Sequence, residues 1–310
     1  MSNIKMLLLT CLVALGMFSS CKKDENDMVT EKSIGTLVAE NQNLTLLKAA
    51  VVRAGLLETL SGNGTFTVFA PDNAAFQAAG LGTEAAINAV PVEDLKKIVL
   101  YHVLGQRYAS GAIPDGTNEL SSVENINTYV TKNMNGVFVN GAKVTTADVT
   151  ASNGVVHIVN KVLMPPSGNI VALAQSNPDL SLLVAAVLRA SEGTTNVASV
   201  LSGNGPFTVF APTNAAFQAA GFPDAAAIQA ADPNTLAGIL TYHVIAARVF
   251  SSDLSEGAMP ATVNGGTVTI TLSGGAKVKG AGNTTASNIT ATDMMATNGV
   301  VHVVDAVLLP

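Results

Sequence analysis

The sequence predicts an α+β fold that occurs twice along the chain, and three observations lead to this prediction. Residues 61–80 return as residues 202–221 with changes at only two positions, so the chain contains an internal repeat. The first part of each copy has apolar residues at helical spacing, whereas β-branched runs and Asn-Gly turns dominate its last third. Helices that precede a group of strands favour an α+β domain over alternating βαβ units.

The N-terminus has the features of an export signal. Lys5 precedes an apolar run over residues 6–17, which is too short for an ordinary membrane-spanning helix. Phe18-Ser-Ser-Cys21 resembles a bacterial lipobox, in which the cysteine receives diacylglycerol. We expect residues 1–20 to be a lipoprotein signal peptide, Cys11 to be removed with it, and Cys21 to carry the lipid. The alternative is a soluble secreted protein in which Cys21 is a free thiol.

A short polar stretch follows the expected lipid anchor. Residues 21–30 are predicted to be the lipidated cysteine and a flexible tether, which includes Lys22-Lys-Asp-Glu-Asn-Asp27. This stretch also resembles the Lys-then-acidic signals that send some lipoproteins to the outer face of an outer membrane. We therefore expect an exported protein, lipid-anchored to the outer membrane and facing the cell surface.

The repeat sets the domain boundaries. We expect a first domain over residues 31–165, a linker over 166–168 and a second domain over 169–310. Tyr101 and Tyr242 are 141 residues apart, whereas Asn153 and Asn298 are 145 apart, which places an insertion in the late hairpin of the second copy. A further insertion is expected near residues 191–198. Both lie in polar stretches that contain Gly, where loops tolerate added residues.

The first predicted helix and strand of the repeat are well marked. Residues 44–54 have apolar side chains at helical spacing and stop at Gly55, which favours a helix. Residues 65–69 read Thr-Phe-Thr-Val-Phe, a β-branched and aromatic run that predicts a strand. The following Ala70-Pro71 is expected to end this strand.

Two more helices are expected in the middle of each copy. Asp72, or Thr213 in the second copy, offers an N-cap oxygen to a helix over residues 73–79 that closes at Gly80. Residues 93–101 then form an amphipathic pattern whose apolar side chains face inward.

The last third of each copy is predicted to be β-structure. Residues 127–132 and 137–139 flank Asn135-Gly136, which is a strong hairpin signal. Asn153-Gly154 then introduces an apolar strand over residues 155–159.

Three ordered motifs, each present twice, resemble those of the fasciclin (FAS1) family. In the first copy they are Thr67-Val-Phe-Ala-Pro-Asp-Asn-Ala-Ala-Phe76, Tyr101-His102 and Asn153-Gly-Val-Val-His-Ile-Val-Asn-Lys-Val-Leu-Met-Pro165. The third motif of the second copy has Asp305, as the family favours, where the first copy has Asn160. The chain thus looks like a bacterial lipoprotein with two tandem fasciclin domains.

This resemblance implies a β-wedge of strands with packed helices in each domain. It also implies cell adhesion or binding of an extracellular protein, matrix component or polysaccharide, without a general catalytic activity. The leading hypothesis is therefore a surface-anchored adhesion protein. A glycan- or small-ligand-binding lipoprotein that supports nutrient capture is the alternative, in which polar loops such as residues 283–292 supply hydrogen bonds. Tyr108 and Tyr129 occur only in the first copy, so a sugar-stacking site there is expected to be asymmetric.

Composition disfavours several other classes of protein. The net charge is −6 and Lys pairs occur only at Lys22-Lys23 and Lys96-Lys97, so we expect no nucleic-acid partner. Both cysteines lie at the N-terminus, which leaves no thiolate for a metal site in the body of the protein. Gly62-Asn63-Gly64 lacks a Lys at phosphate-loop spacing and precedes a strand, so it is interpreted as a turn. We expect no catalytic residue, metal site or cofactor.

The four histidines form two matched pairs. In each copy, two histidines such as His102 and His157, with an aspartate shortly before the Asn-Gly turn, Asp148 or Asp293, are compatible with a metal site or an acid–base pair. Their spacing matches no motif of that kind. Because His157 and His302 lie in apolar strands, the favoured interpretation for these two is a structural imidazole bonded to the backbone. A hydrolase is the third hypothesis, and it requires an activity that is lost when both are replaced by Asn.

Tyr101-His102 and Tyr242-His243 are the candidate binding residues. In the fasciclin family this segment is proposed as an adhesion contact, so the resemblance implies a binding role for all four side chains. The alternative is packing, with an imidazolium at a helix C-terminus that interacts favourably with the helix dipole. Six phenylalanines of the strand and the following helix are expected in the core: Phe66, Phe69, Phe76, Phe207, Phe210 and Phe217.

Overall fold

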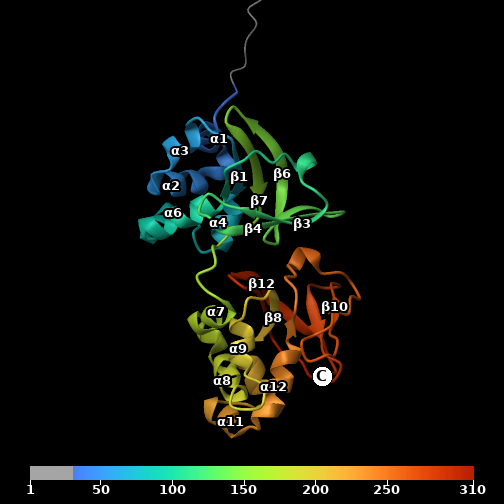
Figure 1. The fold of residues 1–310 in the computed structure, drawn as a ribbon. Helices are drawn as coiled ribbons and strands as arrows, with labels where there is room; N and C mark the ends of the chain where they lie inside the picture. Colours follow the sequence, from blue (N-terminus) through green and yellow to red (C-terminus); the bar gives the residue numbers. More distant parts are fainter. Residues whose placement is uncertain (1–30) are drawn as a thin grey trace, which may run out of the picture. The chain divides into compact units, whose positions relative to one another are not determined.

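The computed structural model describes residues 31–310, and the predicted signal peptide, the lipidation of Cys21 and the tether lie outside these residues. The described part contains two copies of an α+β domain, which confirms the predicted fold class. Within each copy the helices gather beside a single sheet (Figure 1).

The first copy has six α-helices and a seven-stranded sheet. The helices are α1 (Ile34–Glu40), α2 (Thr45–Arg53), α3 (Leu57–Ser61), α4 (Asn73–Ala78), α5 (Glu84–Ala89) and α6 (Val92–Tyr101), with the 3-10 turns η1 (Gln42–Leu44) and η2 (Ser110–Ala112). The strands are β1 (Phe66–Pro71), β2 (Val103–Leu104), β3 (Gly116–Ser121), β4 (Asn127–Asn133), β5 (Gly136–Val139), β6 (Ala142–Ala151) and β7 (Gly154–Val159). Their order in the sheet is β2-β1-β7-β6-β5-β4-β3, and only β1 and β7 are parallel.

The second copy repeats this arrangement with a six-stranded sheet. Its helices are α7 (Ile170–Ser176), α8 (Ser181–Ala190), α9 (Val197–Ser202), α10 (Asn214–Ala219), α11 (Ala225–Ala230) and α12 (Pro233–Tyr242), with η3 (Pro178–Leu180) and η4 (Ser251–Asp253). Its strands are β8 (Phe207–Pro212), β9 (Val244–Ile245), β10 (Thr269–Thr271), β11 (Lys277–Lys279), β12 (Ser287–Ala296) and β13 (Gly299–Val304). Their order is β10-β11-β12-β13-β8-β9, with β8 and β13 as the parallel pair.

The predicted helix signals are confirmed. The Asp72 carboxylate accepts a hydrogen bond from the Ala75 N–H at 2.7 Å, and the Thr213 hydroxyl accepts one from the Ala216 N–H at 3.2 Å. Both side chains therefore satisfy a free N–H group in the first turn of the helix that they precede. Helix α2 ends just before Gly55, which has a φ of 70° that favours glycine.

The strands agree with the sequence in part. The hairpin of β4 and β5 is confirmed, and β1 ends at Pro71 as expected, although Ala70 and Pro71 themselves still pair with β7. Strands β3 and β6 were not predicted from the pattern. Strand β6 is largely exposed, and a register shift interrupts it near Asp148, which has a φ of 60°. A bulged, polar strand has neither the alternation nor the apolar run that marks a strand in a sequence.

Each domain has an apolar cluster between its helices and sheet, and a second cluster among its strands. Along β1, Val68 belongs to the first of these clusters and Phe69 to the second, so both faces of this strand are buried. The predicted core phenylalanines are confirmed. Phe69, Phe76, Phe210 and Phe217 are fully buried, and Phe66 and Phe207 pack against the helix-side clusters.

The expected insertions lie in connections of the second copy. Residues 191–196 connect α8 and α9, whereas residues 54–56 connect α2 and α3. The connections on both sides of β11 are also longer than those beside β5. The expectation of a polar loop over residues 283–292 is wrong, because residues from Ser287 onward belong to β12.

Among the described residues, no single helix has the length and apolar character needed to cross a membrane. Helices Ile170–Ser176 and Pro178–Ala190 meet that test only as a pair, and the chain bends by 111° between them.

Candidate functional site

The first and third motifs lie on adjacent parallel strands. Strands β1 and β7 pair in register from Phe66 with Gly154 to Pro71 with Val159, and β8 and β13 pair in the same way. A Cβ added at Gly154 would lie 2.0 Å from the Phe66 carbonyl oxygen, and one at Gly299 would lie 2.2 Å from the Phe207 carbonyl oxygen. The glycine after each asparagine therefore permits the close approach of these two strands.

Asn153 is a buried connection between three segments. Its Oδ1 accepts a hydrogen bond from the Ile34 N–H at 2.9 Å, where α1 begins. Its Nδ2 donates to the carbonyls of Leu60 and Gly62 at 2.9 and 2.8 Å, where α3 ends. One amide thus satisfies backbone groups at two helix termini and fixes both to the start of β7.

Asn298 makes the same three hydrogen bonds in the second copy. Its Oδ1 accepts from the Ile170 N–H at 3.0 Å, and its Nδ2 donates to the carbonyls of Leu201 and Gly203 at 2.8 and 2.7 Å. In the sequence, Asn153-Gly154 and Asn298-Gly299 indicated the start of a strand and of the third motif, but not a connecting role for the asparagine side chains. The identity of both residues in the two copies was the available signal for a further role.

Tyr101 and Tyr242 are buried in their domains, with exposures of 0% and 1%. The Tyr101 hydroxyl donates to the Asn127 carbonyl at 3.0 Å and accepts from Asn140 Nδ2 at 2.9 Å. Burial raises the pKa of Tyr101 to about 12. The Tyr242 hydroxyl donates to the Thr267 carbonyl and accepts from the Ala281 N–H at 2.9 Å. Each hydroxyl therefore connects the end of a helix, by two hydrogen bonds, to residues in or beside the strands.

His102 connects the end of α6 to the C-terminal segment of the first domain. Its Nδ1 lies 2.7 Å from the Ile98 carbonyl, and its Nε2 accepts a hydrogen bond from the Leu163 N–H at 2.8 Å. A nitrogen that accepts carries no proton, so Nδ1 is the protonated nitrogen and the ring is neutral. Burial lowers the pKa of His102 to about 4. The expectation of an imidazolium at this helix terminus is therefore wrong.

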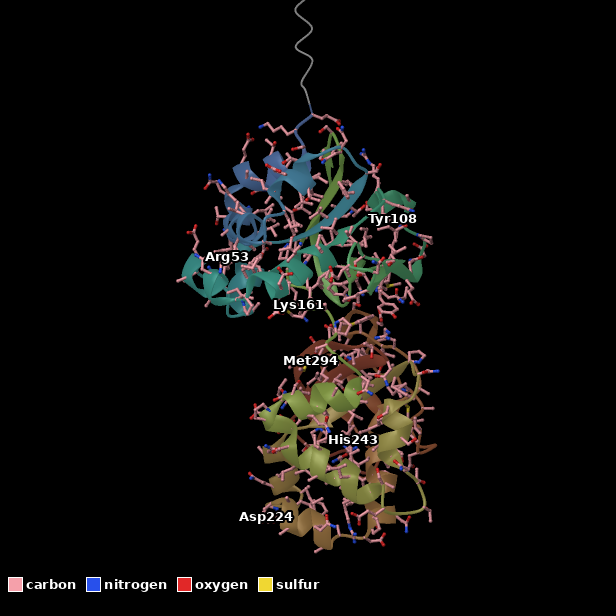
Figure 2. The ribbon with its side chains drawn as sticks, turned by 60° about the vertical axis from the view of Figure 1, so that its left-hand side comes forward. Arg53, Tyr108, Lys161, Asp224, His243 and Met294 are labelled. Atoms are coloured by element: carbon pink, nitrogen blue, oxygen red, sulfur yellow. The ribbon has the colours of Figure 1, made fainter. Side chains whose placement is uncertain are left out.

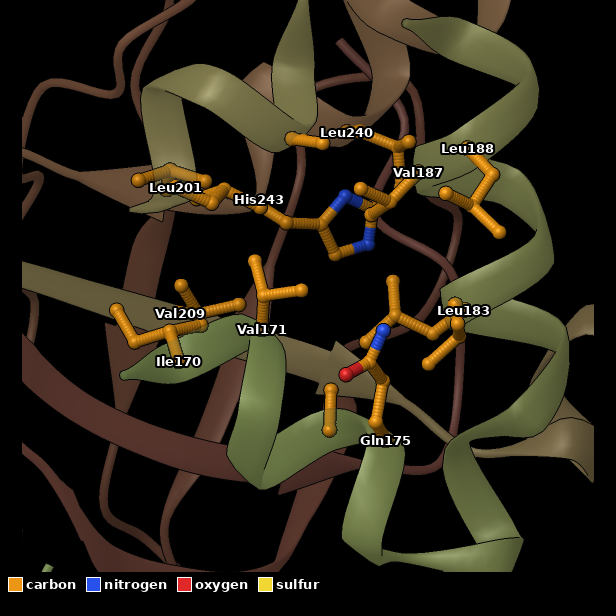
Figure 3. A pocket seen from close by; sticks show the side chains of 14 residues that line it. Ile170, Val171, Gln175, Leu183, Val187, Leu188, Leu201, Val209, Leu240 and His243 are labelled. Carbon is orange, nitrogen blue, oxygen red and sulfur yellow. The ribbon is translucent and has the colours of Figure 1, made fainter. Parts of the chain in front are cut away.

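His243 has the same environment in the second copy. Its Nδ1–H donates to the Ile239 carbonyl and its Nε2 accepts from the Leu308 N–H, both at 2.8 Å. Burial lowers its pKa to about 4 as well. Figure 3 shows the imidazole ring of His243 among apolar side chains, including Leu240 and Val187, that line a pocket.

The Tyr-His side chains are thus packing residues in the described conformation. His102 and His243 are 3% and 1% exposed, so like the two tyrosines they present almost no surface to a partner. A direct contact with a receptor stays a prediction that requires these side chains to leave their positions.

His157 and Asp148 come together, but not as an acid–base pair. The His157 Nδ1 accepts from the Asp148 backbone N–H at 3.2 Å, and its Nε2 lies 2.8 Å from the Tyr108 carbonyl. Both ring nitrogens are therefore used by the backbone, which confirms the structural interpretation. The Asp148 carboxylate instead accepts from the Ser110 N–H at 2.8 Å and from the Ser110 hydroxyl. Burial raises the pKa of Asp148, but these hydrogen bonds outweigh it and lower the pKa below its usual value.

The second copy repeats this arrangement. The His302 Nδ1 accepts from the Asp293 N–H at 3.2 Å, and its Nε2 lies 2.9 Å from the Val249 carbonyl. The Asp293 carboxylate accepts from the Ser251 N–H at 2.7 Å and from the Ser251 hydroxyl at 2.6 Å. Burial lowers the pKa of His302.

The Ser110 and Ser251 hydroxyls therefore bond to a carboxylate rather than to the nearby imidazole, so neither forms a Ser–His pair. Within residues 31–310, no group of three or more His, Cys, Asp or Glu side chains is placed to hold a metal ion. The arrangement instead fixes a loop to a strand in both copies. Figure 2 labels Tyr108, which belongs to this loop in the first copy.

Thr67 and Thr208 are further structural residues that the sequence analysis missed. The Thr67 hydroxyl donates to the Gln106 carbonyl at 2.7 Å and accepts from the Tyr108 N–H at 2.8 Å. The Thr208 hydroxyl makes the equivalent bonds to Ala247 and Val249 at 2.6 and 2.8 Å. A buried Thr in an apolar strand, repeated at an offset of 141, was the available signal.

Comparison with known proteins gives one family. The sequence profile of the fasciclin domain matches residues 42–165 and 179–310. The chain is 31% identical over 255 residues to transforming growth factor-beta-induced protein ig-h3 of Sus scrofa, a match that covers 81% of this chain and 35% of that protein. It is also 39% identical over 135 residues to protein sll1483 of Synechocystis, covering 43% of this chain and 74% of that protein.

A solved structure is also similar. A FAS1 domain pair from the insect cell adhesion molecule fasciclin I aligns with a TM-score of 0.41 at 19% sequence identity, over 87% of this chain and 98% of that one. The chain spans about a third of the length of the animal relative named above.

Proposed function

Because the chain belongs to the fasciclin domain family, we propose that its two tandem domains bind an extracellular protein, matrix component or polysaccharide in cell adhesion. We propose further that a lipid on Cys21 holds the protein at the outer membrane, with the domains facing the cell surface.

One observation carries the binding role. In both copies the imidazole nitrogens, which could act as an acid or a base, are already hydrogen-bonded to the backbone. Each of the four rings bonds to two backbone groups: His102, His243, His157 and His302. A general acid or base must reach the proton of a substrate, and these nitrogens are already occupied. The domain therefore supports recognition at its surface better than a reaction at a buried centre.

The proposed anchor is supported by the sequence alone. Phe18-Ser19-Ser20-Cys21 follows an apolar run of signal-peptide length, and Lys22-Lys23 with the acidic residues after it resembles the signals that send some lipoproteins to the cell surface. A diacylated cysteine supplies about 0.8 kcal/mol per buried methylene, and stable anchoring needs two or more chains.

The charge of the protein limits the class of partner. A net charge of −6 disfavours nucleic acids and other strongly anionic partners. Sugar binding usually relies on exposed aromatic rings, and Tyr108 and Tyr129 are partly buried side chains of the first copy. Glycan capture in nutrient uptake therefore stays the alternative, and the partner screen includes it.

We propose that the Tyr-His side chains do not touch the partner but hold neighbouring backbone segments in place. Tyr101→Phe with Tyr242→Phe removes two hydroxyls that bond to the backbone and keeps the aromatic rings. We expect this variant to bind its partner with wild-type affinity and to be less stable. A loss of affinity at unchanged stability would instead favour direct contact by these residues.

The binding role is tested by capture with the fragment from Val29 to Pro310, which contains the whole compact unit that begins at Glu31. The fragment is immobilised and exposed to purified matrix proteins, polysaccharides and surface extracts of neighbouring cells. We expect saturable binding to at least one of them, and none to a heat-unfolded fragment. Failure of every class to bind would refute the proposal.

A further inference from the structure

Helices of the second domain enclose an apolar pocket. Its walls come from α7, α8, α9 and α12, with β8 and β9 behind them (Figure 3). The cavity volume is about 40 Å³. A single water needs roughly 10–15 Å³ by the same measure, so the space holds an aliphatic group of several atoms.

The pocket has almost no polar character. Among its lining side chains only His243 and Gln175 have polar atoms, and both nitrogens of His243 are bonded to the backbone. The imidazole therefore presents carbon atoms and its ring face to the cavity. An apolar cavity without free hydrogen-bonding groups stays dry and favours an apolar ligand over water.

The hydrogen bonds of Asn153 and Asn298 show which residues of the two domains are equivalent. Asn153 and Asn298 contact Ile34 and Ile170 at the starts of α1 and α7. They also contact Leu60 and Leu201 in α3 and α9. Counting from these residues, Val171 corresponds to Gly35, Ala174 to Val38 and Ala198 to Leu57.

Val171 of the second domain takes the place of a glycine in the first domain. In the first domain α1 lies so close to α3 that a Cβ at Gly35 would be 2.1 Å from the Ser61 hydroxyl oxygen and 3.2 Å from the Leu57 carbonyl oxygen. A side chain at this position would require the Ser61 hydroxyl to rotate away and would contact the Leu57 carbonyl tightly. In α7 this position is Val171, whose side chain lines the pocket.

Two of the residues that face the pocket are small. Val38 is buried in the core of the first domain and Leu57 packs against it. Their counterparts Ala174 and Ala198 both line the pocket. At these two positions the second domain has side chains that are shorter by two or three carbon atoms, and the pocket lies beside them.

A serine in the loop between α8 and α9 connects the two helices by hydrogen bonds. The Ser191 hydroxyl donates to the Val187 carbonyl at 2.7 Å and accepts from the Ala198 N–H at 2.9 Å. This serine lies in the connection that is longer in the second copy. It therefore joins the start of α9 to the end of α8, and Ala198 and Val187 both line the pocket.

The mouth of the pocket is apolar and uncharged. Leu188 lies at the opening and is 58% exposed, and Gln175 is also exposed. Val184 lines the pocket where the first domain has Lys48. No lining residue carries a charge, so the site favours a neutral polar group at the opening, within reach of an amide.

We propose that the second domain binds a neutral aliphatic molecule, whose hydrocarbon chain enters the pocket and whose uncharged hydroxyl, ester or amide end meets Gln175. The first domain, with Gly35, Val38 and Leu57, does not bind it. This inference is independent of the anchor and of the adhesion partner.

The test uses a chain of residues 22–310, which lacks Cys21 and therefore carries no acyl group, without detergent. It is titrated with 1-octanol and, separately, with octanoate, while the methyl NMR signals of Val171, Leu183 and Leu201 are followed. We expect saturable shifts of these signals with octanol and binding at least tenfold weaker with octanoate. Val38 and Leu47 in the first domain are the matched controls and are expected not to shift.

A filled variant tests the location of the site. Ala174→Val with Ala198→Leu introduces the side chains of the first domain, and we expect it to lose octanol binding while its melting temperature stays equal or rises. Val52→Ala on the exposed face of α2 is the control and is expected to bind as the wild type does. If the filled variant does not fold, the wild-type chain alone tests the location: shifts confined to the pocket methyl groups support it, and equal shifts in the first domain refute it.

A vesicle arm distinguishes a soluble ligand from a bilayer lipid. If the wild-type chain floats with phosphatidylcholine vesicles and the filled variant does not, the acyl chains of the membrane are the aliphatic ligand. Octanol binding without flotation would identify a soluble ligand. Octanol binding that persists in the filled variant, or the absence of binding in both arms, would overturn the proposal.

Discussion

The side chain of Asn153 accepts a hydrogen bond from the backbone N–H of Ile34, 119 residues earlier in the chain, at 2.9 Å. The same amide donates to two carbonyls at the end of α3. Asn298 repeats all three bonds in the second domain. One buried amide in each domain thus holds the first helix, the third helix and the last strand together.

Replacement of Asn153 by Leu is expected to destabilise the first domain strongly. The change leaves the Ile34 N–H and two carbonyls without their partner, and an orphaned buried polar group costs about 1–3 kcal/mol. Urea unfolding of the full mature chain measures the loss. Asn298→Leu is expected to cost a similar amount in the second domain, and Asn63→Ala, at an exposed turn, to cost little. Equal stability of the Asn63 and Asn153 variants would contradict this role.

Gly154 and Gly299 are expected to tolerate no side chain. Alanine at Gly154 places a Cβ 2.0 Å from the Phe66 carbonyl oxygen, so the parallel strands β1 and β7 must separate. We expect a loss of more than about 3 kcal/mol, which is in the range of severe packing changes. Gly105→Ala is the control, because no atom lies within 4 Å of the added Cβ. Thermal melting that is the same for both variants would refute the close-approach argument.

Stability is expected to fall below about pH 6.5 because of His102 and His243. Their pKa is about 4 in the folded protein and 6.5 without the fold, so in this range the unfolded chain takes up protons that the folded chain does not. The contribution is fully present above pH 6.5 and is lost as the pH decreases to 4, by up to ~3 kcal/mol per histidine.

Urea midpoints between pH 4 and 8 test this dependence. His102→Gln with His243→Gln should reduce the slope, since glutamine can donate and accept without taking up a proton. A smaller dependence of the urea midpoint on pH is expected to remain in this variant, because burial also lowers the pKa of His302. An unchanged slope in the double variant would show that other groups cause the acid sensitivity.

Ser110 and Ser251 are expected to be unreactive towards fluorophosphonates. Their hydroxyls donate to Asp148 and Asp293, and no imidazole nitrogen is placed to remove the proton. Intact-mass spectrometry of the treated protein measures the labelling. A stoichiometric adduct on either serine would revive the hydrolase hypothesis.

Local signals in the sequence predicted many elements of the fold. The N-cap of Asp72, the glycine after α2 and the Asn135-Gly136 hairpin each act within a few residues and were read correctly. The repeat also revealed that two domains share one fold.

Contacts between residues far apart in the chain could not be predicted from these local signals. The parallel pairing of β1 with β7 joins segments about 90 residues apart, and His102 is neutral because its Nε2 accepts from Leu163, 61 residues later. Strand β6 was missed because a bulge at Asp148 interrupts an exposed run. The pocket of the second domain is lined by Val171, Ala174 and Ala198 together, and each is an ordinary helical residue in the sequence.

The most direct test of the central claim is adhesion of cells that make the protein to a surface coated with its captured partner. Cells with the wild-type chain are compared with cells that make Cys21→Ala, which keeps both domains and removes the site of the proposed lipid. We predict that wild-type cells adhere, that Cys21→Ala cells do not, and that the released Cys21→Ala protein blocks adhesion of wild-type cells. Undiminished adhesion of the Cys21→Ala cells, or released protein that does not compete, would contradict the account.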